Sequence, residues 1–488
     1  MSKPATAFAL ALPPRDSETP AYRWLYASLR ALILEGRLRS GAKLPATRDL
    51  ALQYGLSRGT IVSAFELLKS EGYLRGTIGS GTYVSKVLPD ALLHVKRATG
   101  PASVLQRKKR SRVSDYGRRV NLFSGFEIRP SRAFRPNVPA LDLFPTALWT
   151  QITARRWRRA SMQFLLGCDP MGYGPLRDAV ADHLSTSRGV KCSSEQIAIV
   201  SGVQEALDLT SRLLLNPGDR VSVENPGYPG ARMAFEAVGA RVSAVSLDDD
   251  GMIVRGNSLL GSRLVYVTPG HQFPLGITMS LSRRLELLEW ARKSGALIFE
   301  DDYDSEYRFE GQPVPALQSL DNHSNVIFIG SFSKTLFPSL RVGYVVLPPS
   351  LADCFVSFRY RTDFRNSTFD QAVLCDFIVD GHLARHLRRM RNLYAGRLAA
   401  LIEGSKQHLS GLLELSDVRA GLYTIGFLKN GMTSRQAETL AAAQGVEVLA
   451  VDRYTLRRPD PKGLLLGFAA YDETVIRQEL LRLAKALS

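Results

Sequence analysis

Lys334 lies in a short segment whose side chains can hold a phosphate beside a reactive amine. Ser331 and Ser333 precede it by three residues and by one, and Arg341 follows seven residues later. Hydroxyls and a guanidinium can bind a phosphate while the lysine amine reaches an aldehyde carbon. The combination favours a Schiff base between Lys334 and pyridoxal phosphate over the simpler interpretation of Lys334 as a surface lysine.

A second segment can bind the same phosphate through its backbone. Ser201-Gly202-Val203-Gln204 follows a predicted strand and opens a predicted helix. The amides of Gly202, Val203 and Gln204 can therefore point at an anion from a helix N-terminus. Ordinary helix capping is the alternative interpretation of this segment.

A cluster of acids follows a predicted buried strand within Ala296 to Phe309. Asp301 stands directly at the end of that strand and shares its side with Leu297 and Phe299, because strand side chains alternate with a period of two. A carboxylate there can keep a pyridine nitrogen protonated and the ring electron-withdrawing. The other acids of the cluster are expected to be solvated: Asp302, Asp304 and Glu306.

These residues need a scaffold that brings strand ends together. From about Phe134 onward, strand-like runs alternate with helical stretches, which predicts a mixed α/β layer. The predicted strands are Gln196–Val200, Arg220–Glu224, Leu264–Thr268, Ala296–Glu300, Val326–Ile329 and Val342–Leu347. From about Pro349 the pattern predicts a separate, smaller α+β lobe.

The first hundred residues predict a different domain. Apolar residues at helical spacing indicate a helix from Tyr22 to Glu35, and a short second helix is expected to direct Leu50 and Leu52 inward. Ser57 is placed to cap a third helix that runs to about Glu71. Two short strands around a glycine-rich loop between residues 73 and 84 then predict a wing.

The charge of the chain is concentrated at this end. Residues 1–120 hold 21 Lys and Arg against 8 Asp and Glu, which accounts for +13 of the total formal charge of +17. Such a domain fits double-stranded DNA, because basic side chains that neutralise phosphates release condensed counterions. A membrane surface is the competing partner for a basic segment, and solvated surface charge is the competing interpretation of single arginines.

Cysteine usage and hydropathy predict a cytoplasmic protein. Cys168, Cys192, Cys354 and Cys375 lie far apart without a C-x-x-C pair, which argues against a disulfide framework and against a zinc site. We expect no bound metal. No segment approaches 18 consecutive apolar residues, so no membrane partner is expected either.

The N-terminal segment resembles the GntR-type winged helix-turn-helix. The matching stretches are LPATRDLA (Leu44 to Ala51), GLSRGTIVSAFELLKSEGYL (Gly55 to Leu74) and GSGTYV (Gly79 to Val84). Ala46 departs from the serine that such domains often carry before the Thr-Arg pair, which removes one phosphate contact. The resemblance and the helix-opening pattern imply DNA contacts by Arg48, Ser57, Arg58, Thr60 and Gly79.

The rest of the chain resembles fold-type I aminotransferases, and its fusion to a GntR-type head resembles the MocR family of regulators. The resemblance implies a large α/β domain with a mainly parallel sheet, a smaller α+β lobe and a homodimer. In ENPGYPGAR it implies that Tyr228 stacks on the cofactor ring. In ALIFEDDYDSEYRF it implies that Asp301 pairs with the pyridinium nitrogen and that Tyr303 contacts the phenolic oxygen. The expected cofactor-binding residues are Gly202, Val203, Gln204, Tyr228, Asp301, Tyr303, Ser331, Ser333, Lys334 and Arg341.

Two departures from aminotransferases bear on activity. TPGHQFPLG (Thr268 to Gly276) lacks the asparagine of the usual Asn-Pro-x-Gly turn, which leaves the roles of His271 and Gln272 open. The C-terminal strand that usually carries a carboxylate-binding arginine reads GLLLGFAAYDE from Gly463. Arg232 or Arg453 can supply the charge only from elsewhere in the chain, so transaminase activity is expected to be weak or absent.

The sequence therefore predicts three parts: residues 15–86 as the DNA-binding domain, 87–120 as a basic linker, and 121–488 as an aminotransferase-like domain that binds pyridoxal phosphate. The predicted function is a transcriptional regulator whose effector domain senses pyridoxal phosphate or an amino compound and controls operator binding. An active aminotransferase with a DNA-binding head is the alternative. A third possibility is a dimerisation scaffold that never holds a cofactor.

Overall fold

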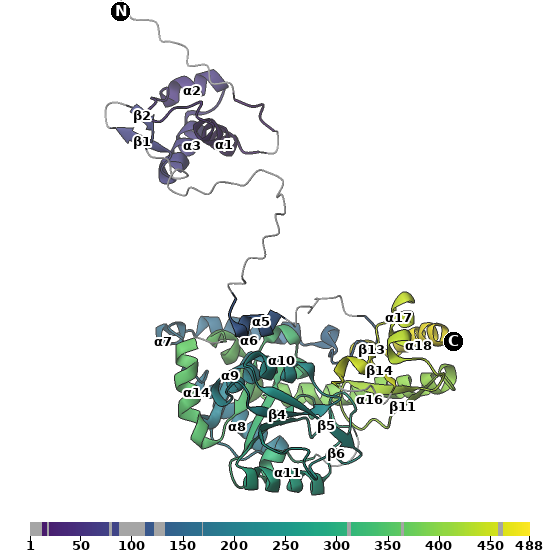
Figure 1. Ribbon diagram of the computed structural model, residues 1–488. Helices are drawn as coiled ribbons and strands as arrows, with labels where there is room; N and C mark the ends of the chain where they lie inside the picture. Colours follow the sequence, from purple (N-terminus) through teal and green to yellow (C-terminus); the bar gives the residue numbers. More distant parts are fainter. Residues whose placement is uncertain are drawn as a thin grey trace, which may run out of the picture. The chain divides into compact units, whose positions relative to one another are not determined.

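The chain forms two compact units, Met1–Arg110 and Ser111–Ser488, which are considered separately (Figure 1). The computed structural model describes residues 12–16, 19–77, 81–86, 113–121, 132–167, 169–309, 314–362, 366–456 and 462–488. No helix within these ranges is both long and apolar enough to cross a membrane.

The N-terminal unit packs three helices against a hairpin. Helices α1 (Ala21–Leu34), α2 (Thr47–Tyr54) and α3 (Arg58–Ser70) precede strands β1 (Leu74–Thr77) and β2 (Gly81–Val84). The strands pair antiparallel with Leu74 opposite Val84, and the core is formed by Leu25, Leu29, Leu50, Ile61, Phe65 and Leu68. The predicted winged helix-turn-helix is confirmed.

One inward position in this unit was predicted wrongly. Leu50 is fully buried, whereas Leu52 is 78% exposed. Two residues along an α-helix turn the side chain by about 200°, so Leu52 points away from the face that carries Leu50.

The end of the predicted linker is also different. Residues 87–112 lie outside the described part of the chain, but Asp115–Asn121 form helix α5, which packs on the second unit. Tyr116 Oη donates to Asp208 Oδ1 at 3.1 Å and Arg119 Nε donates to the Ala237 carbonyl at 2.9 Å. A helix of seven residues held by polar contacts leaves no apolar periodicity in the sequence, so the linker prediction extended too far.

The second unit is built on an eight-stranded sheet. In spatial order the strands are β3 (Ile197–Val200), β10 (Gly343–Val346), β9 (Val326–Ser331), β8 (Leu297–Asp302), β7 (Ser262–Val267), β4 (Arg220–Asn225), β5 (Arg241–Asp248) and β6 (Gly251–Met252). The five strands from β9 to β5 run parallel, whereas β10 is antiparallel to both of its neighbours and β6 is antiparallel to β5. All six predicted strands are present, and the sheet is mainly parallel as predicted.

Alternating strand residues bury the two faces of this sheet under different helices. Ala198 and Val200 face α9 (Val203–Leu214), α10 (Pro229–Ala237) and α14 (Pro349–Thr362). Ile197 and Ile199 face the layer of α6 (Thr146–Arg158), α8 (Gly174–Arg188) and α15 (Thr368–Val379), and α11 (Leu281–Ser294) with α12 (Leu317–Leu320) covers that face near β5. Figure 1 shows α9 and α10 on one side of β4 and β5 and α11 on the other.

The smaller lobe begins later than the sequence pattern suggested. Helices α14 and α15 pack on the large sheet, because Phe355 and Phe377 belong to its cores. The lobe itself combines α16 (His382–His408) with a four-stranded antiparallel sheet in the order β11 (Leu413–Leu415), β12 (Tyr423–Leu428), β14 (Gly463–Gly467) and β13 (Leu449–Ala450). Helices α17 (Ser434–Ala443) and α18 (Glu473–Leu487) complete it.

Candidate cofactor site and nucleic-acid interface

Strand register assembles the predicted phosphate-binding residues. Gly343 of β10 lies opposite Val200 of β3 on one side and opposite Ser331 of β9 on the other. The three strand ends therefore meet, and each leads directly into a predicted site segment: Ser201 to Gln204, Ser331 to Lys334, and Arg341. A β-carbon on Gly343 would come within 2.9 Å of the Gly330 carbonyl and 3.2 Å of Gly202 Cα, so only glycine permits this close approach.

Backbone donors are available where these strands end. Gly202 adopts φ 136°, a conformation that favours glycine, and starts α9 without a side-chain cap. The first N–H groups of a helix have no intrahelical acceptor, so the amides of Val203 and Gln204 can bind an anion. The side chain of Gln204 is engaged elsewhere, donating to the Gly230 carbonyl at 3.1 Å.

Lys334 lies in the one-turn helix α13 (Phe332–Thr335) that follows β9. Ser331 Oγ caps this helix by accepting from the Ser333 amide at 3.2 Å. The Lys334 ammonium lies 3.8 Å from the centroid of the Tyr303 ring. Burial lowers the pKa of Lys334, although Asp304 and Asp301 oppose the change, and a lowered pKa favours the neutral amine that attacks a carbonyl.

Asp301 is buried, and only one of its two carboxylate oxygens has a hydrogen-bond partner among the described residues. Its Oδ2 accepts a hydrogen bond from Tyr266 Oη at 2.5 Å, and its Oδ1 has no partner among the described residues. Burial raises the pKa of Asp301 to about 6, against the opposing Tyr266 hydrogen bond and the Lys334 charge. A buried carboxylate oxygen without a donor is costly unless a ligand supplies one, and a pyridinium N–H is a donor of the required kind.

Tyr303 is held by a polar cluster that the sequence did not predict. Its hydroxyl lies 2.9 Å from Tyr423 Oη and 3.2 Å from His271 Nδ1, and His271 Nδ1 lies 2.9 Å from Asp304 Oδ2. All four side chains are buried. His271 therefore orients Tyr303 from the loop after β7, while Gln272 donates to the Pro226 and Phe273 carbonyls and supports the loop itself.

The expectation of solvated acids is wrong for two of the three residues. Asp304 is 1% exposed and pairs with His271, and Asp302 is 7% exposed and forms an ion pair with Arg188 at 2.7 Å. Glu306 is intermediate in exposure. Their partners come from the loop after β7 and from the end of α8, which are distant in sequence, so no local pattern could indicate this burial.

Tyr228 is placed beside the same site. Its ring centroid lies 6.4 Å from that of Tyr266, and its hydroxyl donates to Gln204 Oε1 at 3.4 Å. Burial and the Asp301 charge raise the pKa of Tyr228 to about 12, and the charge of Arg341 opposes that change. Arg341 itself is exposed, with φ 52°.

Neither candidate for a carboxylate-binding arginine is free. Arg232 Nε lies 2.8 Å from Glu236 and Arg453 Nε lies 2.6 Å from Glu438. Both line a small cavity with Tyr228. The C-terminal strand β14 is filled by buried leucines, as expected: Leu464, Leu465 and Leu466.

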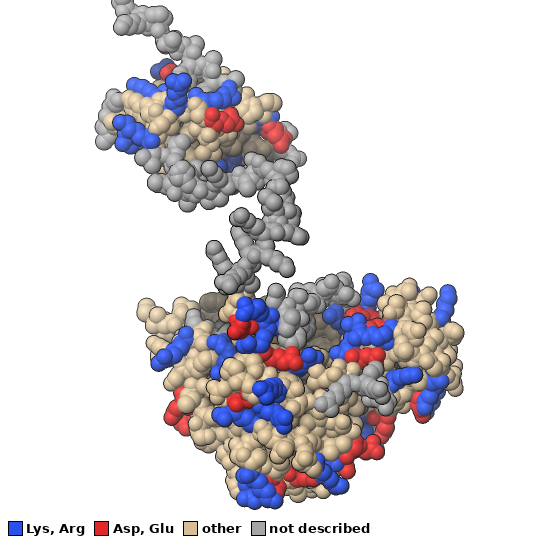
Figure 2. Space-filling view, in the orientation of Figure 1, with Lys and Arg blue, Asp and Glu red and all other residues tan. Residues whose placement is uncertain are grey.

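The candidate DNA-reading residues lie on the surface of the N-terminal unit. Ser57 Oγ caps α3 by accepting from the Thr60 amide at 3.1 Å, which confirms the predicted helix start. Arg48 and Arg58 are exposed and form no ion pair within the described part of the chain. Gly79 lies outside the described residues. On the face drawn in Figure 2, basic side chains predominate on this unit, whereas both charges are interspersed on the second unit.

Comparison with known families assigns both units. The family described as aminotransferase class I and II matches residues 142–478, and the family described as bacterial regulatory proteins, gntR family, matches residues 21–84. The chain is 38% identical to the probable rhizopine catabolism regulatory protein MocR of Rhizobium meliloti, over 97% of this chain and 94% of that protein.

Two further similarities concern pyridoxal chemistry. The chain is 30% identical to the pyridoxine biosynthesis transcriptional regulator PdxR of Corynebacterium glutamicum, over 95% of each chain. Among solved structures, α-aminoadipate aminotransferase LysN from Thermus thermophilus, complexed with N-(5'-phosphopyridoxyl)-L-leucine, is similar with a TM-score of 0.66 and 27% identity. That similarity covers 73% of this chain and 91% of LysN.

Proposed function

Because this chain belongs to the MocR family of gntR-type regulators, which fuse a DNA-binding head to an aminotransferase class I and II domain, we propose that it is a transcriptional regulator controlled by pyridoxal phosphate bound at Lys334. The observation that carries the proposal is the buried Asp301 Oδ1, which has no partner among the described residues and stands on the strand next to the one that leads to Lys334. An apolar scaffold would not retain such a group unless a ligand met its hydrogen-bonding need.

The residues present fit the cofactor at each of its polar positions. The α9 amides, Ser331, Ser333 and Arg341 would hold the phosphate, Asp301 the ring nitrogen and Tyr303 the phenolic oxygen, with Tyr228 against the ring. When bound, pyridoxal phosphate supplies an aldehyde that links to a primary amine and a ring that withdraws electrons. Burial lowers the pKa of Lys334, which favours the reactive neutral amine, and the hydrogen bond from Tyr266 favours the ionised form of Asp301.

Control of DNA binding requires that a ligand distinguish two states of the protein. Cofactor binding, or replacement of Lys334 by an amino compound as the cofactor's partner, shifts the population only if the two states bind that ligand with different affinity. We propose that states competent and incompetent for operator binding differ in this way. The regulator then acts in the cytoplasm, where its DNA is.

We also propose a homodimer. The α6 and α7 (Met162–Leu165) region exposes large apolar side chains: Trp157 at 56%, Met162 at 82%, Leu165 at 63% and Leu166 at 84%. A patch of this kind on a protein surface is typical of an interface. Two DNA-binding heads on one dimer would also match two operator half-sites.

The alternative, an aminotransferase with a localising DNA head, is less well supported. The arginines near Tyr228 are paired with glutamates, and the strand β14 carries leucines. A bidentate arginine contact to a substrate carboxylate depends on its position. We therefore expect slow or no turnover of common amino acids.

One experiment tests the proposal directly. Full-length protein, Lys334→Ala and the surface control Lys293→Ala are titrated with pyridoxal phosphate, and the absorption band of lysine-bound pyridoxal is recorded. Borohydride reduction followed by peptide mapping identifies the modified lysine. The same proteins are titrated with an operator selected from random DNA, with and without the cofactor.

We expect the band and a cofactor-dependent change in operator affinity in the wild type and in Lys293→Ala, and neither in Lys334→Ala. A modified peptide without residue 334 would exclude the site. An operator affinity that is indifferent to the cofactor in the wild type would exclude the regulatory role.

A further inference from the structure

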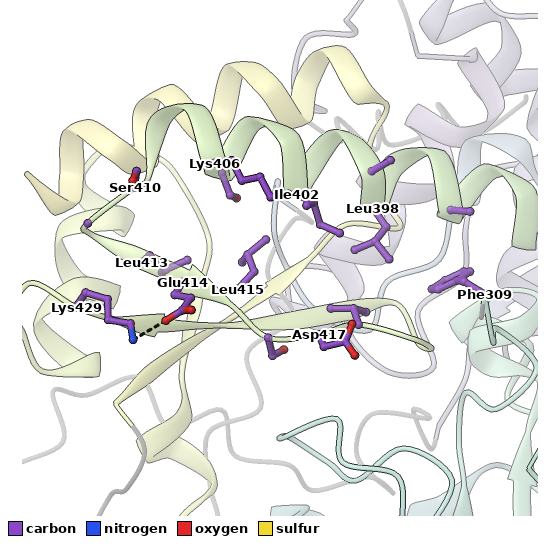
Figure 3. Close-up of a pocket in the computed structure, with 16 residues that line it drawn as sticks. Phe309, Leu398, Ile402, Lys406, Ser410, Leu413, Glu414, Leu415, Asp417 and Lys429 are labelled. Carbon is purple, nitrogen blue, oxygen red and sulfur yellow. Dashed lines mark ion pairs between the residues drawn. The ribbon is translucent and has the colours of Figure 1, made fainter. Parts of the chain in front are cut away.

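A large groove lies in the smaller lobe, outside the residues that surround Lys334. It has a volume of about 980 Å³ and separates α16 from β11 (Figure 3). This volume is at the upper end of the range of small-molecule sites, about 300–1,000 Å³. In Figure 3, Leu398 and Ile402 project from α16 into the space above β11, Phe309 lies at one end and Lys429 at the other.

The lining is apolar in its interior. The apolar side chains come from α16, β11 and the adjoining loops: Phe309, Leu398, Ile402, Leu413, Leu415 and Val418. Ser405, which also lines the groove, is 5% exposed, and its hydroxyl has no partner among the described residues.

Four charged residues line the groove, and three of them form ion pairs. Lys429 pairs with Glu414 at 2.5 Å, and Asp417 pairs with Arg419 at 2.9 Å. Lys406, one residue beyond Ser405, is exposed and has no ion pair in the described ranges. The groove therefore combines apolar side chains with one lysine that has no ion pair within the described part of the chain, which is complementary to an apolar molecule with one anionic end.

The walls of the groove continue into the Lys334 site. The Phe309 amide donates to the Arg419 carbonyl and the Gly421 amide donates to the Tyr307 carbonyl, both at 2.9 Å, so the segment after β8 is joined to the segment before β12. The first of these segments carries Tyr303, and the second leads to Tyr423, whose hydroxyls lie 2.9 Å apart.

A second cavity lies across the same loop. Ser416, Asp417 and Val418 line the groove on one side and, on the other, a small cavity that reaches His271 and Tyr423. A ligand that moves this loop therefore acts on side chains that position Tyr303 beside Lys334.

We propose that the groove is a second ligand site for a small molecule with an aliphatic or aromatic body and a single carboxylate, and that its occupancy is coupled to cofactor binding at Lys334. The binding part stands on the groove alone. The coupling part rests on the proposed function, because it requires a cofactor at Lys334.

Binding is tested with decanoate, kept well below its micelle-forming concentration, by calorimetric titration into the full-length protein. Decanol and decylamine have the same chain with a neutral or a positive end. Ala399→Trp fills the groove from α16, and Ala443→Trp places the same ring on the exposed end of α17. Lys406→Gln removes the charge of Lys406, and Lys485→Gln removes an exposed lysine that does not line the groove.

We expect saturable binding of decanoate that is weakened more than about tenfold by Ala399→Trp and about fivefold by Lys406→Gln, the latter corresponding to an exposed ion pair. Both control variants should bind like the wild type, and decylamine should bind less well than decanoate. Absence of saturable binding, equal binding of decylamine, or binding that Ala399→Trp leaves unchanged would overturn the site.

Coupling is tested by titrating pyridoxal phosphate with and without saturating decanoate. The dissociation constant of pyridoxal phosphate should change by at least about fivefold, and pyridoxal phosphate must change decanoate affinity by the same factor, since coupling is reciprocal. Lys334→Ala should bind decanoate normally and lose the coupling. If decanoate leaves the affinity of the wild type for pyridoxal phosphate unchanged, the coupling is overturned. If the wild type binds decanoate but shows no absorption band of lysine-bound pyridoxal, only the function proposed for Lys334 is contradicted.

Discussion

Tyr266→Phe offers the sharpest test of how the protein prepares Asp301. The Tyr266 hydroxyl donates to Asp301 Oδ2 at 2.5 Å, and both side chains are buried. Phenylalanine keeps the ring, whose centroid lies 5.9 Å from that of Phe299, and removes only the donor. A hydrogen bond to a charged group contributes about 1.5–3 kcal/mol, which corresponds to a change of about 10-fold to 100-fold in the acid dissociation constant of Asp301.

The direction of the effect follows from which form of Asp301 binds the cofactor. The pKa of Asp301 is raised to about 6 in the wild type, so its carboxylate is mostly ionised at pH 7. The variant holds its proton more tightly, and only the ionised form accepts from a pyridinium N–H. At pH 7 the dissociation constant of pyridoxal phosphate should therefore rise about twofold to tenfold relative to the wild type, and this ratio should fall toward one by pH 9.

The assay is an absorbance titration with pyridoxal phosphate at fixed pH values between 6.5 and 9. Taking the ratio of variant to wild type cancels the titration of the free cofactor. Tyr394→Phe is the matched control, because its buried hydroxyl accepts from the Ala140 amide at 3.0 Å, away from the site. A ratio of one at pH 7, or a ratio that grows with pH, would refute the role assigned to Tyr266.

Three further predictions concern DNA binding and stability. Arg58→Ala should weaken binding to the selected operator by about 1–3 kcal/mol if Arg58 contacts a base. The control Arg37→Ala should weaken binding to specific and to non-specific DNA equally. Equal effects of the two variants in anisotropy titrations would exclude a base contact by Arg58. In the cofactor-free protein, burial raises the pKa values of Glu224 and Glu300 to about 7 and that of Asp301 to about 6. Their protonated forms stabilise the fold below about pH 4, and this stability is lost as the pH rises to 7, so the midpoint of thermal unfolding should fall between pH 5 and pH 8. His183 and His386, whose pKa values are lowered by desolvation, oppose this change below pH 6.5. A midpoint that rises over this range would contradict the burial of these carboxyls. Arg188→Met leaves Asp302 buried without its cationic partner and should lower the free energy of unfolding by about 3–5 kcal/mol, as measured by chemical denaturation. The control Arg292→Met, on the exposed face of α11, should change that free energy little. Similar losses in the two variants would contradict a distinct contribution of the buried ion pair.

The parts of the fold that could be predicted from the sequence are those with short-range signals. Ser57 has its cap partner three residues later, and the six predicted strands of the large sheet are mostly buried on both faces, whereas β5, which is largely half-buried or exposed, was not predicted. The order Asp301, Tyr303, Ser331, Lys334 and Arg341 follows the ends of two adjacent parallel strands and of the antiparallel β10. Where a feature depends on its own segment, as the Ser57 cap does, the sequence was sufficient to predict it.

The errors at the candidate site share one physical cause, which is a partner remote in sequence. Asp302 and Asp304 look like solvated loop acids until Arg188 and His271 are brought beside them. Tyr266 is one aromatic residue in a buried strand, and only the pairing of β7 with β8 places its hydroxyl on Asp301. No spacing rule within one segment indicates such contacts.

The apolar contacts that β14 makes beside Tyr303 bear on whether the proposed regulator also turns over a substrate. Strand side chains alternate, so Leu464 and Leu466 enter the main core while Leu465 packs with Phe273, Tyr303 and Tyr423. A substrate carboxylate placed against this apolar surface would be desolvated without a cationic partner, which is costly. An apolar contact stabilises a bound ligand equally before the reaction and in the transition state. Such uniform binding increases the affinity for the ligand and does not accelerate its reaction. If this strand is the one that carries the carboxylate-binding arginine in aminotransferases, its leucines are expected to favour occupancy over turnover, which is the property that the proposed regulator needs from a cofactor site.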